Sequence, residues 1–265
     1  MKNILITGST DGIGFETAKS LAAEGHHIWL HGRSLEKTRA AEQRLLQVVP
    51  RGQFSHFACD LADFAQIRSA SADLLRSLSR LDVLINNAGV YLKDFSLSPY
   101  GVEMTMTINH LGPFLLTKLL HDALKAAAPS RVINVSSIAH TRGQLRTGKF
   151  ALNTDFDPYS AYAASKLANV LFTKKLAELW KKDGISVYSL HPGVINTKLL
   201  KTGFGAIGAE TASGALTSVF LATEEIVPAE SGSYFDNCKP RPVSPLAEDA
   251  ELREQLWQWS EKLTS

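Results

Sequence analysis

Residues 3–14 read NILITGSTDGIG, a short apolar run followed by three closely spaced glycines. A continuous apolar run is typical of a strand buried on both faces, and a helical pattern starts directly after the glycines. A turn this tight requires residues without a Cβ atom, and it lets a pyrophosphate approach the backbone N–H groups at the start of the helix. The stretch therefore predicts a strand-turn-helix unit that binds a nucleotide, although such glycines can also serve the turn alone.

The spacing of the glycines separates this turn from other motifs. The pattern is GxxxGxG, so it is not GxGxxG, and it is not a phosphate-binding loop because no lysine follows. It is not a hydrolase nucleophile elbow either, because Thr10 and not a serine stands between Gly8 and Gly12. We expect the Asp11 carboxylate to bond backbone N–H groups of the turn. The cofactor-binding residues expected here are Gly8, Thr10, Asp11, Gly12, Ile13 and Gly14.

The rest of the chain repeats the same alternation of apolar runs and helical patterns. The expected strands are 3–8, 27–32, 53–61, 81–89, 131–137, 185–193 and 232–236. The expected helices are 14–24, 34–48, 63–79, 101–127, 160–182, 209–222 and 248–263. Uninterrupted repeats of this kind predict an α/β chain, residues 1–265, with a single-domain Rossmann fold. Its sheet should be doubly wound, mostly parallel, of about seven strands, and flanked by helices.

Two segments that interrupt the alternation are candidate pocket walls. Residues 139–158 and 194–208 each follow the carboxyl end of an expected strand. Open α/β sheets bind ligands beyond these strand ends, so we expect both segments to contact the substrate. Each could equally be an ordinary surface loop.

Composition excludes several classes of protein. The chain is 45% hydrophobic and 20% charged, and its net charge of +2 gives no electrostatic reason to bind nucleic acid or a membrane. Cys59 and Cys238 lie far apart, and the histidines lack metal spacing, so we expect no disulfide and no metal site. No run approaches the ~20 apolar residues of a transmembrane anchor. A soluble protein of the cytoplasm or another reducing compartment is expected.

The end of the second strand, HGRS, bears on the choice of cofactor. A carboxylate usually holds the free ribose 2′-hydroxyl of NAD(H) here, but positions 31–34 contain none. Arg33 instead offers a planar set of donors that suits a phosphate, with Ser34 beside it and Lys37 one turn further on. This favours NADP(H) over NAD(H), although Arg33 could also lie in solvent at a strand end.

Residues 158–166, PYSAYAASK, place two tyrosines near one lysine. Tyrosine has a reference pKa near ~10, and a neighbouring cation lowers it, which would make the phenol a better proton donor near neutral pH. Lys166 is four residues after Tyr162 and shares its helix face, whereas Tyr159 lies two turns from Lys166. Spacing therefore favours Tyr162 as a general acid, with Tyr159 as a candidate pocket wall.

Several motifs, taken in order, resemble the short-chain dehydrogenase/reductase family over essentially the whole chain. They are TGSTDGIG, Asp60-Leu61, NNAG at 86–89, Asn109, NVSS at 134–137, YAASK at 162–166 and HPG at 191–193. The resemblance implies that Ser137 rather than Ser136 polarises the substrate oxygen, that Lys166 also binds the nicotinamide ribose, and that Asn109 supports a proton relay. The implied catalytic residues are thus Asn109, Ser137, Tyr162 and Lys166. The further implied cofactor contacts are Asp60, Leu61, Asn87, Ala88, Gly89, Tyr162, Lys166, Pro192, Gly193, Ile195 and Thr197.

Within the family, NVSSIAH and AYAASKLANVLF are similar to the retinol-dehydrogenase-like branch. That branch implies a lipophilic aldehyde, ketone or alcohol as substrate, although we expect this chain to differ from the membrane-bound members in having no N-terminal anchor. The helices that carry Asn109 and Tyr162 are apolar enough to pair in a homodimer. Two other functions stay open, a non-catalytic NADP(H)-binding sensor or scaffold and an isomerase or dehydratase on the same fold.

Overall fold

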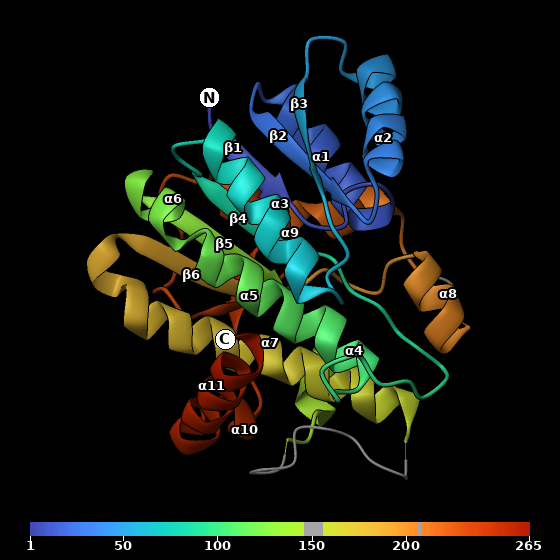
Figure 1. Ribbon diagram of the computed structural model, residues 1–265, viewed down its shortest axis with the longest axis vertical. Helices are drawn as coiled ribbons and strands as arrows, with labels where there is room; N and C mark the ends of the chain where they lie inside the picture. The colour runs from blue at the N-terminus through green and yellow to red at the C-terminus, as the bar shows by residue number, and fades with distance from the viewer. Residues whose placement is uncertain (146–155, 206–207) are drawn as a thin grey trace.

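The computed structural model describes residues 1–145, 156–205 and 208–265, and its central feature is one sheet with helices on both faces (Figure 1). The strands lie in the order β3-β2-β1-β4-β5-β6-β7-β8, and the first seven are parallel. Their bounds are β1 Asn3–Ile6, β2 His27–Gly32, β3 Gln53–Ala58, β4 Val83–Asn86, β5 Ser130–Val135, β6 Ile185–His191, β7 Tyr234–Asp236 and β8 Lys239–Arg241. The predicted doubly wound, mostly parallel sheet is confirmed.

The sheet has one strand more than the seven expected. β8 is a three-residue edge strand that runs antiparallel to β7, with Asp236 opposite Lys239. The two residues between them, Asn237 and Cys238, have φ values of 53° and 59°, which fits a two-residue hairpin turn. Sequence patterns do not predict β8, because it is short and contains Pro240, a residue that strands tolerate at an edge.

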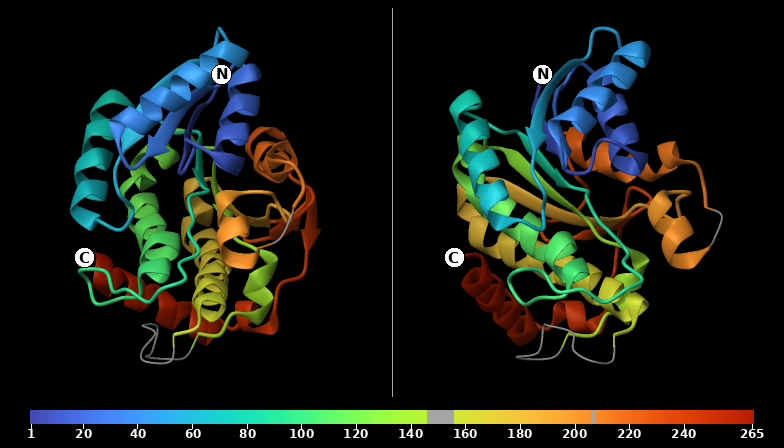
Figure 2. Two further views of the ribbon diagram at one scale, coloured as in Figure 1. Left: turned by 90° about the vertical axis from the view of Figure 1, so that its right-hand side faces the viewer. Right: turned by 45° about the vertical axis from the view of Figure 1, so that its right-hand side comes forward.

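Two groups of helices cover the two faces of the sheet (Figure 2). Buried side chains of α1, α2 and α9 share one apolar core with the sheet, and those of α3, α5 and α7 share the other. The larger helices are α1 Gly12–Ala23, α2 Leu35–Val48, α3 Phe64–Ser77, α5 Gly112–Leu119, α7 Pro158–Trp180, α9 Thr211–Thr223 and α11 Ala250–Thr264. The shorter ones are α4 Met104–Met106, α6 His121–Ala126, α8 Lys198–Phe204 and α10 Pro245–Glu248. No helix among the described residues is both long enough and apolar enough to cross a membrane.

The helix expected over 101–127 is divided in the structure. A π-helical turn, Thr107–Leu111, joins α4 to α5, and a further break at Leu120 separates α5 from α6. A π-turn holds one residue more than an α-turn, which changes where the side chains around it point, and such turns are frequent at functional sites. Asn109 lies inside this turn.

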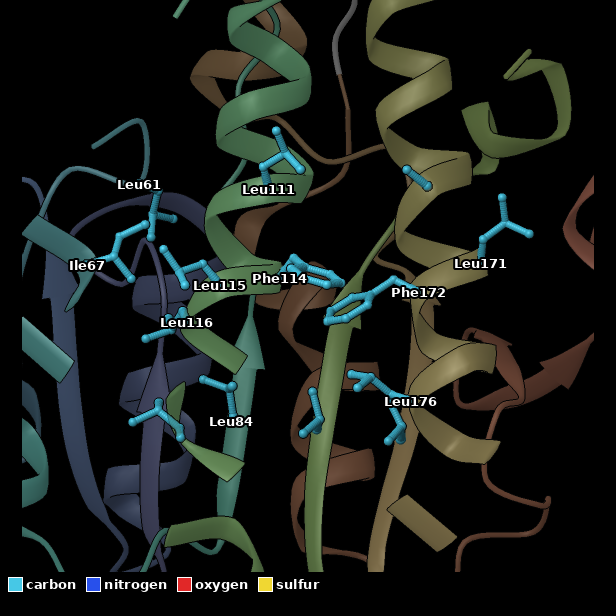
Figure 3. Close-up of a cluster of buried hydrophobic side chains, with 14 of the residues drawn as sticks. Leu61, Ile67, Leu84, Leu111, Phe114, Leu115, Leu116, Leu171, Phe172 and Leu176 are labelled. Atoms are coloured by element: carbon cyan, nitrogen blue, oxygen red, sulfur yellow. The ribbon is translucent and has the colours of Figure 1, made fainter. Parts of the chain in front are cut away.

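The core between α5 and α7 is aromatic. Phe114 and Phe172 point toward one another, with ring centres 5.2 Å apart (Figure 3). Trp257 of α11 packs on the same pair, 4.9 Å from the Phe114 ring, and Ser260 of α11 bonds to the buried His110 Nε2 at 2.8 Å. The C-terminal helix therefore covers part of the α5–α7 surface.

Candidate active site

The glycine turn lies at the carboxyl end of β1 and leads into α1. Gly8 has φ +66°, and a Cβ atom on Gly14 would lie 2.3 Å from the Gly8 carbonyl oxygen and 2.5 Å from the Asn87 amide nitrogen. The turn can close only where these positions lack side chains. Asn87 in turn donates from its amide to the Thr7 carbonyl at 2.8 Å, which ties the NNAG turn to the glycine turn.

Asp11 begins α1. Its carboxylate accepts a hydrogen bond from the Gly12 N–H at 2.8 Å, the kind of contact expected for this residue. It also forms an ion pair with Lys198 of α8, which lowers the pKa of the Asp11 carboxyl. The second contact was not expected, because 194–208 appeared to be a loop. Thr197 starts α8 by accepting a hydrogen bond from the Leu200 N–H.

A cavity of about 1220 Å³ opens above the carboxyl ends of the central strands. Thirteen of the expected cofactor-binding residues line it: Gly8, Thr10, Asp11, Gly12, Ile13, Gly14, Arg33, Asp60, Leu61, Asn87, Ala88, Gly89 and Thr197. Six others are not on its wall, namely Ser34, Tyr162, Lys166, Pro192, Gly193 and Ile195. Ser34 caps α2 by accepting a bond from the Lys37 N–H, and the Ile195 side chain packs where Gly214 leaves room.

Positive charge gathers on the part of this cavity near β2. Arg33 and Lys37 line it, as expected, and so does Arg44 on the next turns of α2. The Arg44 guanidinium lies 4.2 Å above the Phe15 ring and donates to the Thr10 carbonyl at 3.3 Å. Sequence reasoning missed Arg44, although it follows Lys37 by two helical turns on the same face. A narrow glycine turn beside a basic wall fits a dinucleotide phosphate.

Tyr162, Lys166 and Ser137 come together at the first turns of α7 and the end of β5. The Tyr162 phenol is hydrogen-bonded to the Ser137 hydroxyl. The Lys166 ammonium lies 5.5 Å from the Tyr162 ring centre and donates to the Val135 carbonyl at 3.0 Å. Ser136 points away, because its hydroxyl donates to the Lys166 carbonyl at 2.8 Å. Of the two serines, only Ser137 faces Tyr162.

Burial dominates the ionisation of this pair. It raises the pKa of Tyr162 to about 12, although the Ser137 hydroxyl acts in the opposite direction. It lowers the pKa of Lys166 to about 8. The effect expected of Lys166, a lower pKa for Tyr162, is therefore opposed by desolvation. A phenolate and an ammonium stabilise each other when both are charged, so the pair ionises more easily together than either group does alone.

Asn109 lies where the cavity meets this group. Its side-chain oxygen accepts from the Val90 N–H at 2.7 Å, and its amide donates to the Val90 carbonyl at 2.9 Å and to the Ser165 hydroxyl at 3.0 Å. A Cβ atom on Gly89 would lie 3.2 Å from the Lys166 ammonium and 3.5 Å from the Asn109 oxygen. Gly89 therefore lines the cavity on one side and lies close to the side chains of Lys166 and Asn109 on the other.

Residues 2–205 match the family described as short chain dehydrogenase. The chain belongs to this family. The short-chain dehydrogenase is 38% identical over 265 residues to retinol dehydrogenase 12 of Bos taurus, which covers 97% of this chain and 84% of the relative. The predicted resemblance to the retinol-dehydrogenase-like branch is confirmed, and the protein is an oxidoreductase that acts on CH–OH groups.

Two solved structures resemble this short-chain dehydrogenase. An uncharacterised protein from Mycobacterium Paratuberculosis is 30% identical and superimposes with a TM-score of 0.83, over 100% of this chain and 93% of that one. A metagenomic short-chain oxidoreductase, solved in complex with NADP, is 26% identical with a TM-score of 0.66, over 84% of this chain and 91% of that one. The likeness to the first structure covers this whole chain, and the likeness to the short-chain oxidoreductase covers most of it.

An apolar wall surrounds Tyr162 of the short-chain dehydrogenase. The buried side chains of Ala139, Tyr162 and Ala163 form it with the partly buried Tyr91, Tyr159 and Leu199. The Tyr91 and Tyr162 ring centres are 5.6 Å apart, and α8 approaches so closely that a Cβ on Gly203 would lie 2.9 Å from the Tyr91 ring. Of the segments expected to form the pocket, 194–208 supplies Leu199 and 139–158 supplies Ala139, whereas residues 146–155 and 206–207 lie outside the described residues.

Proposed function

We propose that this enzyme transfers hydride between NADP(H) and the carbonyl or alcohol carbon of a lipophilic aldehyde, ketone or alcohol. The observation that carries the proposal is the position of Tyr162. Its phenol is bonded to Ser137, lies one turn from Lys166 and belongs to an apolar wall. Leu199 of that wall also lines the large cavity. A substrate held on this wall would therefore lie next to a dinucleotide in the cavity.

NADP(H), when bound, supplies or accepts the hydride. In the direction of reduction, the Tyr162 hydroxyl donates a proton to the substrate oxygen, and the Ser137 hydroxyl donates a hydrogen bond to the same oxygen. The Lys166 ammonium stabilises the phenolate that results. Asn109 supports the return of the proton. It bonds both backbone groups of Val90, and the preceding residue, Gly89, lies next to the Lys166 ammonium. In oxidation the same groups act in reverse.

Arg33 and Lys37 support the preference for NADP(H) over NAD(H). Both line the cavity beside the end of β2, and no carboxylate occupies positions 31–34. Arg44 adds a third cation to the same wall. A 2′-phosphate would be attracted there, whereas a free 2′-hydroxyl would lack its usual carboxylate partner.

The apolar wall supports a lipophilic substrate. Tyr91, Tyr159 and Leu199 present two aromatic rings and a branched aliphatic side chain to the region around Tyr162. The relatives named retinol dehydrogenase suggest retinoids as one group to include in a screen. The length of the carbon chain and the number of rings in the best substrate of such a screen will indicate the shape of this wall.

The homodimer stays a prediction, and the structure limits how it can form. α11 covers part of α5 and α7 through Trp257, and Arg253 of α11 pairs with Glu178 of α7 at 2.8 Å. Pairing of two copies through the part of these helices that α11 covers would displace α11. A reducing compartment such as the cytoplasm also stays an expectation, consistent with the free thiols of Cys59 and Cys238.

A panel of aldehydes, ketones and alcohols, assayed by the absorbance of NADPH, tests the proposal. Turnover of apolar aldehydes by the parent enzyme, lost in Tyr162→Phe and Ser137→Ala, would support it. Cofactor binding with no turnover on any substrate would favour the sensor or scaffold instead. Substrate conversion without net change in cofactor absorbance would favour the isomerase or dehydratase.

A further inference from the structure

Behind Ser137 lie four buried polar atoms that make no hydrogen bond within the described part of the chain. They are His140 Nε2, Ser189 Oγ, His191 Nδ1 and Tyr234 OH. Ser189 and His191 are two residues apart in β6, so their side chains point to the same face of the sheet. Tyr234 of β7 lies opposite Ser189 in the strand register. Tyr234 packs in the same core as α7, so this is the face that α7 covers. An unpaired buried polar group destabilises the folded state, so several together on one face of a sheet need an explanation.

The orientation of His140 decides which of its nitrogens carries the proton. Its Nδ1 lies 2.7 Å from the Ser137 carbonyl oxygen, and a carbonyl can only accept, so Nδ1 is protonated. Burial lowers the pKa of His140, and the side chain is fully buried, so the ring is neutral. Nε2 is therefore a bare acceptor.

Tyr234 provides the matching donor. Its ring centre is 4.7 Å from that of His140, and its side chain is buried. Burial and the charge of Asp236 raise the pKa of Tyr234, so the phenol keeps its proton. A donor and an acceptor, both buried, thus lie on neighbouring rings. A small side-chain rotation or one bridging water would pair them.

His140 also holds Ser137 by two bonds. The Ser137 carbonyl accepts from the His140 side chain at 2.7 Å and from its backbone N–H at 3.1 Å. The Ser137 hydroxyl accepts from the Ala139 N–H at 3.2 Å while it faces Tyr162. The direction of the hydroxyl depends on the backbone at Ser137, and therefore on His140.

We propose that His140 is a positioning residue for Ser137, and that Tyr234 keeps it in the Nδ1–H form by donating to Nε2, directly or through one water molecule. This inference rests on the proposed function, because it gives the Ser137 hydroxyl a role in the reaction. His191, Asp236, Lys166 and Tyr162 are titratable neighbours of the same region. A pH–rate profile would combine all of them, so the tautomer of His140 is the more specific observable.

Two substitutions of His140 separate its two nitrogens. An asparagine amide can replace the Nδ1 donor, whereas a glutamine amide reaches the Nε2 position and leaves the Ser137 carbonyl without that bond. We expect His140→Gln to lower kcat about tenfold with KM for NADPH unchanged, and His140→Asn to recover most of the loss. Wild-type kcat in His140→Gln, with Ser137→Ala inactive, would overturn the inference while leaving the proposed function intact. Full activity in Ser137→Ala would overturn the proposed function first.

The tautomer is measured without turnover, by nitrogen NMR of protein labelled at histidine, with the signal assigned from His140→Asn. We expect the Nδ1–H form in the parent, and a shift of the Nε2 resonance in Tyr234→Phe because its hydrogen bond is lost. Tyr188→Phe is the matched control, since Tyr188 points to the opposite face of β6 and packs in the other core. An Nε2–H tautomer, or no shift in Tyr234→Phe, would contradict the proposal. An equal shift in Tyr188→Phe would do the same.

Discussion

The Lys166 ammonium lies 5.5 Å from the Tyr162 ring centre, one helical turn further along α7, and both side chains are almost fully buried. The two tyrosines of PYSAYAASK therefore have different surroundings. Tyr162 is bonded to Ser137, whereas Tyr159 packs at the edge of the apolar wall.

Tyr162→Phe should reduce kcat by roughly 10² to 10⁴-fold, the usual contribution of a general acid, with little change in NADPH affinity. Tyr159→Phe is the control, because it removes a phenol from the same helix and should change KM for apolar substrates more than kcat. Steady-state kinetics and NADPH titration by fluorescence measure both. A comparable loss of kcat in Tyr159→Phe would mean that the proton donor is misassigned.

Arg33→Ala should weaken the binding of NADPH by about tenfold or more and leave the affinity for NADH nearly unchanged, because only NADPH carries the 2′-phosphate that Arg33 would bind. Arg39→Ala, an exposed arginine of α2 that does not line the cavity, is the matched control. Dissociation constants for both cofactors decide the matter. Equal weakening of NADH and NADPH in Arg33→Ala would refute the assignment of the phosphate site.

Trp257→Ala should lower the free energy of unfolding by about 2–4 kcal/mol, since Trp257 is half-buried and packs on Phe114. It should also increase self-association, because part of the α5–α7 surface becomes exposed. Urea unfolding and light scattering measure the two effects. Trp259→Ala, on the same helix, is the comparison for both effects. If the parent protein is a dimer and Trp257→Ala leaves that dimer unchanged, the dimer interface does not include the part of α5 and α7 that α11 covers.

Stability should fall on acidification through two buried histidines. Burial lowers the pKa of His31 and of His110 to about 4 each, against ~6.5 in an unfolded chain. Below pH ~6.5 the unfolded chain therefore binds protons that the folded chain does not, and the folded state loses stability until about pH 4. From about pH 7.5 to about pH 5 we expect a loss of about 2 kcal/mol per histidine.

Urea unfolding of the protein without cofactor checks this pH dependence. His110→Gln can keep the bond to Ser260 but cannot take up the proton, so it should reduce the pH-dependent loss by about 2 kcal/mol, the share of this one histidine. His121→Gln serves as the control, because His121 is partly exposed beside Asp183. An unchanged pH dependence in His110→Gln would show that other groups cause the loss.

Much of the fold and of the site could be predicted because the decisive patterns are local. The glycine turn, the spacing of Tyr162 and Lys166, and the apolar runs each lie within one or two elements. Arg44 and Lys198 were missed because an arginine on a helix and a lysine after a strand are ordinary surface residues until the fold brings them to the cavity. The contact of His140 with Tyr234 could not be predicted at all, because it joins residues far apart in the sequence.

One short helix, α8, takes part in both halves of the site. Lys198 ties it to the glycine turn at Asp11, and the adjacent Leu199 belongs to both the cavity and the wall around Tyr162. A displacement of α8 that lets a dinucleotide enter the cavity would then also move Leu199, and so change the shape of the apolar wall around Tyr162. We therefore expect compulsory-order kinetics, with the nucleotide first to bind and last to leave.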